Sequence, residues 1–308
     1  MSLAGLGEYE EFPTIMKAVH RYTNCFILFA LVVADSGCAL VRKGAAKLVS
    51  PMAAQLSDGL MRQNDVELVK DGAPSFLLML DALTEAHPGN SSVLLAAAEA
   101  QIAYATGFVD RTRRKRAQTM YFKARNYGVK ALSLRNPDFN AAMDSPLDIF
   151  RASLASFRKR DAQALIDTAT AWVMWIIASS DSPAAMGDMP KVLALMDRVR
   201  ELDPEIRQGS VDLFYGIYYT VLPLGGGRDL ERARTHFERS MGIAGPDYLL
   251  VRVTFAEYYA RYSFDRHLFE ETLRQVLAAE PKTPEFTLMN SVAKMRAEEL
   301  LAMADEFF

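Results

Sequence analysis

Apolar side chains recur every three or four residues along most of the chain after residue 38, and alternating apolar and polar segments are almost absent. Spacing of three and four places the apolar side chains on one face of an α-helix, whereas a half-buried strand would show a period of two. Half of the residues are hydrophobic, which is enough to build a continuous core. The pattern predicts an all-α chain.

Five of the helical segments end in proline and share one layout. Three small or apolar residues stand at positions i, i+4 and i+7, which lie on one side of a helix. Proline, which has no backbone N–H, follows five or six residues later and stops the helix. This layout matches the second helix of a tetratricopeptide repeat (TPR). The segments are Phe76, Leu80, Leu83 with Pro88; Ala124, Gly128, Ala131 with Pro137; Val192, Met196, Val199 with Pro204; Ala233, Phe237, Ser240 with Pro246; and Phe269, Leu273, Val276 with Pro281.

First-helix partners precede three of these segments, with bulky and small residues alternating along one face as close helix pairing requires. They are Trp172, Trp175 and Ser179; Phe214, Gly216 and Tyr219; and Phe255 and Tyr259. The closing prolines are 49, 67, 42 and 35 residues apart, so the repeats are degenerate. One helix pair cannot bury its own apolar face, and stacking of the pairs is therefore expected. The sequence predicts a single TPR-like solenoid over residues 38–308.

The ends of several helices can also be predicted. Asp110, Pro190, the pair Gly209-Ser210 and Asp265 are expected at helix starts. Residues 225–227, three glycines, are expected to connect the two helices of one pair. A C-terminal capping helix is expected from Pro284 to Phe308, with an apolar stripe formed by Leu288, Val292, Met295 and Leu300.

The first 37 residues have the pattern of a secretory signal. A positively charged stretch precedes an apolar run from Cys25 to Ala34, which is too short to span a bilayer, and small residues follow. Cys38 directly after Ser36-Gly37 resembles the cleavage site of a bacterial lipoprotein, although Asp35 stands where an aliphatic residue is usual. The sequence predicts removal of residues 1–37 and lipidation of Cys38. A plain secreted protein with an incidental cysteine is the alternative.

Charge and cysteine content exclude several classes of function. The formal net charge is -3, so no long-range field attracts nucleic acid. The two cysteines precede the predicted folded region and the four histidines are scattered, so no disulfide framework, metal site or cofactor is expected. The basic run from Arg111 to Arg116 is a local exception. It fits either a solvated helix face or a contact with lipid headgroups or an acidic partner.

No arrangement of residues predicts catalysis. The glycines at 225–227 are not followed by the Lys-Ser or Lys-Thr of a phosphate-binding loop. Asp265, Arg266 and His267 stand together, but no serine or cysteine is placed to be activated by the histidine. We therefore expect no catalytic residues and a protein that acts by binding.

Tyrosines on the first helices are the candidates for that binding. A buried hydroxyl needs a hydrogen-bond partner, so tyrosines on a concave face suit a groove or tunnel for an apolar ligand or a peptide. Packing between helices is the alternative, and it is favoured for Trp172, Trp175, Phe214 and Phe255. The candidate ligand-binding or partner-binding residues are Tyr104, Tyr215, Tyr218, Tyr219, Tyr258, Tyr259 and Tyr262.

Taken together, the motifs at residues 193–204, 225–239, 265–277, 290–297 and 305–308 resemble the TatT proteins, TPR-like components associated with tripartite ATP-independent periplasmic (TRAP) transporters. The resemblance implies a periplasmic lipoprotein that docks the solute-binding (P) subunit of the transporter. It also implies self-association, with a trimer as one form, and a tunnel for a small, hydrophobic ligand. The alternative is a TPR lipoprotein that binds peptides or barrel precursors in outer-membrane protein assembly.

Overall fold

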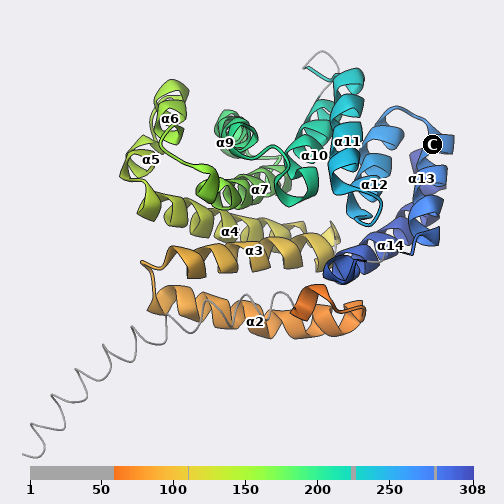
Figure 1. The fold of residues 1–308 in the computed structure, drawn as a ribbon, viewed down its shortest axis with the longest axis horizontal. Helices are drawn as coiled ribbons and strands as arrows, with labels where there is room; N and C mark the ends of the chain where they lie inside the picture. Colours follow the sequence, from red (N-terminus) through yellow and green to blue (C-terminus); the bar gives the residue numbers. More distant parts are fainter. Residues whose placement is uncertain (1–58, 110, 223–226, 281–282) are drawn as a thin grey trace, which may run out of the picture. The chain divides into compact units, whose positions relative to one another are not determined.

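The regular structure of the protein is helical throughout the described residues, 59–109, 111–222, 227–280 and 283–308 of a computed structural model (Figure 1). This confirms the all-α prediction. The helices are α2 (Val66–Ala86), α3 (Ser91–Phe108), η1 (Arg111–Arg113), α4 (Arg114–Arg135), α5 (Pro137–Ala142), α6 (Leu147–Leu154), η2 (Lys159–Asp161), α7 (Ala162–Ala178), α8 (Pro183–Gly187), α9 (Met189–Leu202), α10 (Ile206–Val221), α11 (Leu230–Ala244), α12 (Leu250–Phe255), η3 (Ala256–Ala260), α13 (Arg266–Ala278), η4 (Pro284–Phe286), α14 (Thr287–Ala302) and α15 (Ala304–Phe307).

Three of the predicted proline stops lie directly after helix ends. Helices α2, α9 and α11 end two residues before Pro88, Pro204 and Pro246 respectively. Pro137 also follows a helix end, that of α4, but it opens α5 at the same time. The carbonyl oxygen of the Asn136 side chain accepts hydrogen bonds from the first backbone N–H groups of α5, so the chain turns a corner there. Pro281 lies outside the described residues.

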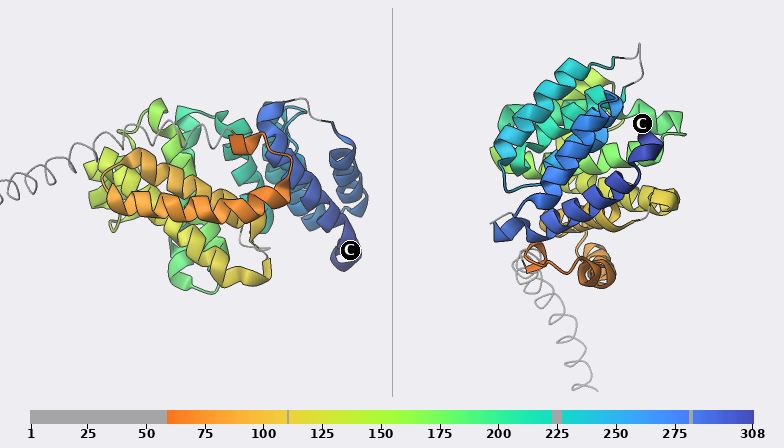
Figure 2. Two further views of the ribbon diagram at one scale, coloured as in Figure 1. Left: turned by 90° about the horizontal axis from the view of Figure 1, so that it is seen from below. Right: turned by 90° about the vertical axis from the view of Figure 1, so that its right-hand side faces the viewer.

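Successive helices pack on one another. Helix α2 contacts α3, α3 contacts α4, and α4 contacts α7, and Figure 1 shows α2, α3 and α4 as adjacent layers. Figure 2 shows the same layers from below and from the side, with α2 nearly end-on in the right-hand view. The predicted pairs α7 with α9, α10 with α11, and α12 with α13 are each in contact. That these helix pairs form a regular TPR superhelix remains a prediction.

Small residues set how closely the helices approach. A Cβ atom at Gly128 of α4 would lie 2.5 Å from Thr168 Oγ1 of α7. At Gly216 of α10 it would lie 2.8 Å from the ring of Phe237 on α11, a side chain with no exposed surface. Both glycines occupy positions that the sequence pattern assigned to helix-pairing faces. The α4–α7 and α10–α11 contacts therefore depend on the absence of a side chain at these two positions.

The C-terminal cap differs in detail from the predicted one. Helix α14 buries Leu288 and Leu300 as expected, but Val292 and Met295 are only partly buried. Ala293 and Ala297 are fully buried instead, against a cluster that includes Ala256 and Ala260. Alanines on both sides let the backbones approach closely, so small side chains occupy the contact line and the larger ones lie at its edges.

Several predictions concern residues outside the described part of the chain. They are the signal over 1–37 with its apolar run from Cys25, the lipidation of Cys38, the cap at Asp110, and the connection through Gly225 and Gly226. Two other predicted caps are confirmed. Pro190 lies in the first turn of α9, and the carboxylate of Asp265 accepts a hydrogen bond from the backbone N–H of Leu268 at 2.9 Å. In the described part of the chain, no helix combines the length and the hydropathy needed to cross a membrane.

Substitution of Gly216 by alanine is expected to destabilise the fold by about 1–3 kcal/mol, because the added methyl group pushes on a fully enclosed Phe237 ring. Gly242 is the matched control on α11, since a Cβ atom there meets nothing within 4 Å. Gly242→Ala should stabilise the protein by roughly 0.5–1 kcal/mol through helix propensity. Urea unfolding followed by circular dichroism measures both, and equal effects of the same sign would contradict the packing argument.

Candidate functional site

Three of the candidate tyrosines, Tyr215, Tyr218 and Tyr219, lie on α10, which packs against α11. Tyr215 is buried, and its hydroxyl donates a hydrogen bond to Asp197 Oδ1 of α9 at 2.6 Å. Burial, with Asp197 adding to it, raises the pKa of the Tyr215 hydroxyl far above its ordinary value, so it stays protonated. Tyr218 and Tyr219 are partly exposed. Burial raises the pKa of Tyr218 as well.

His236 of α11 lies against two of these rings. Its imidazole stacks on Tyr215 and Tyr219, with ring centroids 5.3 and 5.7 Å apart. His236 Nδ1 lies 2.7 Å from Oδ1 of Asp212, a buried carboxylate on α10. The guanidinium of Arg232 covers the Tyr219 ring at 4.2 Å from its centroid. Aromatic stacking, a hydrogen bond and a cation–π contact thus fix the orientation of these rings before any partner binds.

The remaining candidate tyrosines do not join this group. Tyr258 and Tyr259 lie in η3, a π-helical turn, and Tyr259 stacks on Phe255 at 5.0 Å. Tyr262 follows η3 and lies under the guanidinium of Arg228 at 5.3 Å. Tyr104 is buried on α3 beside Phe108. The η3 turn packs against α10 and α11, and Tyr259 lies 6.4 Å from the ring of Phe237, whereas Tyr104 belongs to another part of the fold. The role of these residues in binding stays a prediction.

Of the four side chains for which packing was favoured, three are buried: Trp172, Phe214 and Phe255. Trp175 is partly exposed and lies against Phe122, with ring centroids 5.4 Å apart. Trp172 is fully enclosed, and its indole N–H donates to Asp188 Oδ2 at 2.9 Å. The packing interpretation holds for three residues, and Trp175 lies at the edge of the core.

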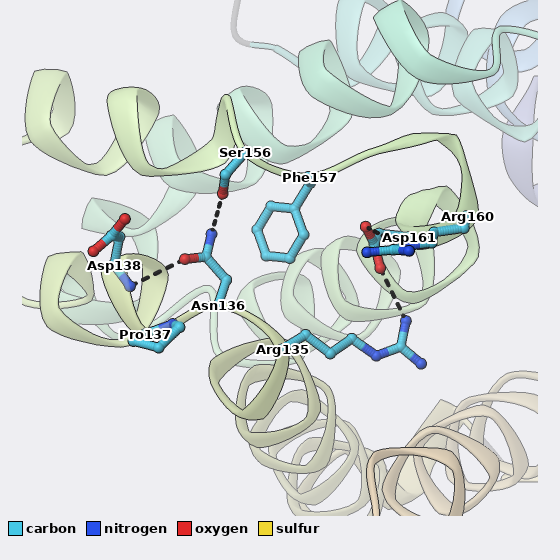
Figure 3. A pocket seen from close by; sticks show the side chains of 8 residues that line it. All are labelled: Arg135, Asn136, Pro137, Asp138, Ser156, Phe157, Arg160 and Asp161. Atoms are coloured by element: carbon cyan, nitrogen blue, oxygen red, sulfur yellow. Dashed lines mark hydrogen bonds and ion pairs between the residues drawn. The ribbon is translucent and has the colours of Figure 1, made fainter.

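A polar pocket opens at the corner between α4 and α5 (Figure 3). Its wall contains Arg135, Asn136, Pro137, Asp138, Ser156, Phe157, Arg160 and Asp161. The amide of Asn136 donates to Ser156 Oγ at 2.8 Å. The carboxylate of Asp161 accepts from Arg135 Nη1 at 3.3 Å and from the backbone N–H of Arg158 at 3.0 Å.

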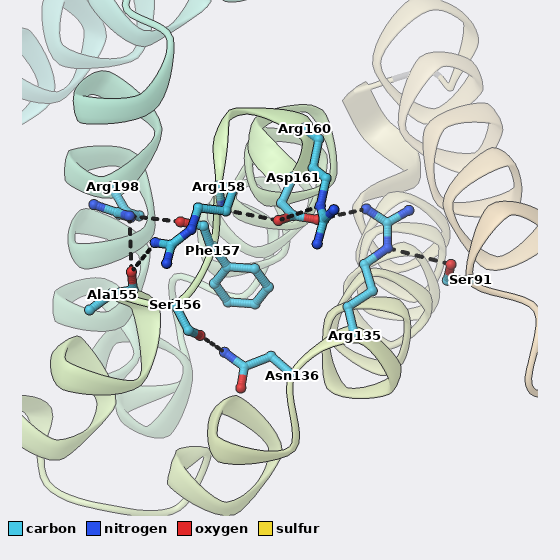
Figure 4. A network of polar contacts seen from close by, with 10 residues as sticks. All are labelled: Ser91, Arg135, Asn136, Ala155, Ser156, Phe157, Arg158, Arg160, Asp161 and Arg198. Carbon is cyan, nitrogen blue, oxygen red and sulfur yellow. Dashed lines mark hydrogen bonds and ion pairs between the residues drawn. The ribbon is translucent and has the colours of Figure 1, made fainter.

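The contacts around this pocket continue into α9 (Figure 4). Arg198 Nη2 donates to the backbone carbonyl groups of Ala155 and Phe157 at 3.1 and 2.7 Å. Backbone carbonyl groups at the end of α6 and a buried carboxylate at the start of α7 thus find their partners inside the protein. These groups already form hydrogen bonds and ion pairs with one another. The pocket is therefore best explained as a structural polar network that fixes α5 and α6 against α4, α7 and α9.

A second polar cluster lies where α10 begins, and sequence reasoning did not find it. Arg207, Gln208 and Gly209 have left-handed backbone conformations, with φ of 47°, 54° and 76°. The first two are costly for residues with a side chain, at about 1–2 kcal/mol each. A helix start was predicted at Gly209-Ser210, and right-handed helix does begin after Gly209. No residue pattern in the sequence indicates the left-handed turn before that start.

Ion pairs hold this turn. Arg207 Nη2 lies 2.8 Å from Glu99 Oε1 on α3 and 2.9 Å from Asp167 Oδ1 on α7. The Asp167 side chain is 7% exposed. Burial raises its pKa to about 6, against the opposing effect of Arg207. Burial acts to lower the pKa of Arg207, but the two carboxylates outweigh it and the pKa is raised. The cluster ties three helices that are distant in sequence.

Comparison with known proteins decides the family. A sequence profile of the family described as TRAP transporter T-component matches residues 62–308. The chain belongs to this family. The match spans all of the helices from α2 to α15, and it confirms the resemblance to the TatT proteins.

A relative of this T-component occurs in Treponema pallidum (strain Nichols), where it carries the description of an uncharacterized protein. It is 24% identical over 316 residues, which cover 92% of this chain and 97% of the relative. Membership in the family assigns the T-component an accessory role in a TRAP transporter, and the family is not one of enzymes. Among the described residues, no group of three or more histidine, cysteine, aspartate or glutamate side chains is placed to hold a metal ion.

The raised pKa of Asp167 predicts a pH dependence of stability. The Asp167 carboxyl binds its proton more tightly in the folded T-component than in the unfolded chain, where its pKa has the ordinary value of 3.8. The contribution of Asp167 to the free energy of unfolding is therefore highest below pH 4. It falls by up to ~3 kcal/mol as the pH rises to about 6. Asp167→Asn should remove that fall, so the variant gains stability relative to wild type between pH 4 and 7.

The measurement is urea unfolding of wild type and Asp167→Asn at a series of pH values. Glu298→Gln is the control, since Glu298 is an exposed carboxylate on α14. A constant stability difference between wild type and Asp167→Asn across this range would show that Asp167 titrates normally.

Proposed function

We propose that this T-component is a lipid-anchored periplasmic protein that docks the solute-binding subunit of a TRAP transporter and assists the transfer of a small, hydrophobic solute. The family match over residues 62–308 is the observation that carries the proposal, because it includes every helix from α2 to α15. The partner is named by the resemblance in sequence, and the fold supplies stacked helices with side chains available for binding. Self-association, as a trimer, belongs to the same proposal.

The α10 tyrosines are the surface that we assign to docking. Tyr218 and Tyr219 are partly exposed, and the guanidinium groups of Arg200 and Arg232 lie over Tyr215 and Tyr219. Tyrosine and arginine are the residues that contribute most often to binding hot spots. Their rings are already fixed by stacking, so little side-chain entropy is lost when a partner binds. The combination of tyrosine and arginine with fixed rings therefore favours a surface that binds a protein over a solvent-exposed surface without function.

The double variant Tyr218→Ser/Tyr219→Ser tests the docking surface. If the two rings are hot spots, their loss should weaken capture of the solute-binding subunit by at least about 30-fold, since each is worth roughly 1–2 kcal/mol. The measurement is recovery of that subunit with tagged T-component, followed by titration of the purified pair. Leu78→Ser removes a side chain that is 71% exposed on α2 and serves as control.

Two outcomes would count against docking at this surface. Wild-type T-component that recovers no solute-binding subunit would remove the partner from the proposal. Recovery that is equal for wild type and the tyrosine variant would leave the partner in place but move the contact away from α10. A melting temperature close to that of wild type shows that the variant is folded.

Lipidation is tested separately, on Cys38. We expect mass spectrometry of the protein from its native membrane to find Cys38 as the first residue, with a diacylglycerol group on its sulfur. In high salt, which suppresses charge contacts with lipid headgroups, Cys38→Ser should move the protein from the membrane to the soluble fraction, because buried acyl chains supply ~0.8 kcal/mol per CH₂ group. An unmodified first residue other than Cys38 would remove the lipid anchor.

A further inference from the structure

The basic run of the sequence lies at an unfavourable end of a helix. Arg113 is the N-cap of α4 and makes no side-chain capping hydrogen bond, and Arg114, Lys115 and Arg116 form the first turn. That turn contains no acidic residue. A helix N-terminus carries partial positive charge and favours anions, so basic side chains there repel both the helix end and one another. An external anion would relieve this repulsion.

One of these cations is used inside the fold. Arg114 Nε donates to the backbone carbonyl of Ala178 at 2.9 Å, and its Nη2 lies 2.8 Å from Ser180 Oγ and 3.0 Å from Asp181 Oδ1. Arg114 thus fixes the beginning of α4 to the end of α7. Arg113, Lys115 and Arg116 are exposed, and within the described ranges they form no ion pair. Three positive charges are therefore available to an anionic surface.

Aromatic side chains continue the same edge. Lys115, Gln118 and Phe122 share one face of α4, at positions i, i+3 and i+7. The amide of Gln118 donates to Ser179 Oγ of α7 at 2.9 Å. One turn further, Phe122 is 43% exposed and contacts the partly exposed ring of Trp175 on α7. We call this seam, formed by residues 113–122 and 175–181, the α4–α7 edge.

We infer that the α4–α7 edge binds the surface of a membrane that contains anionic lipids. Arg113, Lys115 and Arg116 would meet the headgroup phosphates, and Phe122 and Trp175 would enter the headgroup region. Aromatic rings are enriched at that depth of a bilayer. Each basic residue near an anionic surface strengthens binding about five-fold, so three give roughly 100-fold. The rings contact each other and the guanidinium of Arg125, but Phe122 still exposes apolar surface beside the cations. A lipid layer would cover that surface, whereas an acidic protein segment would pair only with the charges.

Vesicle binding tests the inference on the full chain carrying Cys38→Ser, so that no acyl chain contributes. Partitioning is measured with phosphatidylcholine vesicles, with and without phosphatidylglycerol. We expect strong preference for the phosphatidylglycerol vesicles, which weakens as salt is added. Lys115→Glu/Arg116→Glu should reduce partitioning into them by at least about 25-fold. Phe122→Ser should weaken it several-fold without changing its salt dependence.

The matched control is Lys130→Glu/Arg151→Glu. Both residues are exposed on α4 and α6, and the change in net charge is the same. If the control loses as much binding as the Lys115/Arg116 variant, the effect is one of net charge and the inference fails. It also fails if wild type shows no preference for phosphatidylglycerol. Lys115→Gln/Arg116→Gln repeats the test with neutral side chains should the charge reversal unfold the protein.

A parallel titration with the solute-binding subunit separates this inference from the proposed function. The Lys115/Arg116 variant should lose vesicle binding and keep the subunit. Loss of the subunit with unchanged vesicle binding would assign the α4–α7 edge to an acidic protein partner instead, and would overturn the inference. Loss of subunit binding in the α10 tyrosine variant alone leaves the inference intact.

Discussion

The close approach of paired helices is the constraint on which the rest of the fold depends. At the α10–α11 contact, the ring of Phe237 fills the space that any side chain at position 216 would need. That contact brings His236 of α11 against Tyr215 and Tyr219 of α10, so the orientation of the two tyrosine rings depends on Gly216, which lies between them in sequence. The α4–α7 contact at Gly128 plays the same part for the edge that carries Phe122 and Trp175.

Local signals in the sequence predicted the helices well, because local energies determine them. Pro88, Pro204 and Pro246 stop helices by their own chemistry, and Asp265 caps one with its own side chain. Tertiary contacts decided the features that were missed. The left-handed conformation of Arg207 depends on carboxylates that are 40 and 108 residues away, and no local pattern carries that information.

The candidate site was predictable only in part, for the same reason. Helical spacing placed the tyrosines on first helices, and Tyr215 and Tyr219 stack on each other along α10, but spacing could not show that Tyr104 is buried on α3 beside Phe108. The spacing also assigned Val292 and Met295 to the contact line of α14, where Ala293 and Ala297 lie instead. Hydropathy favours the larger side chain, whereas the distance between two backbones selects the smaller one, and that distance is a property of the assembled fold.

The left-handed turn at Arg207 shows how a polar cluster can specify packing at a cost in stability. Arg207 and Gln208 are strained, and Asp167 is charged at neutral pH in surroundings that favour its protonated form. Neither cost is needed to bury apolar surface. What the cluster supplies is a fixed relation between α3, α7 and the start of α10, since moving any one of them breaks an ion pair of Arg207, either with the buried Asp167 or with the more exposed Glu99. The tyrosines on α10 lie within four turns of that fixed point. The docking face that we propose on this helix would therefore keep its position relative to α3 and α7 when a partner binds. If an acyl chain attaches the protein at Cys38, it restrains distance from the membrane but not orientation, whereas an edge formed by α4 and α7 restrains both. Because α10 is tied to α7, an orientation imposed through α7 would be passed on to the proposed docking face.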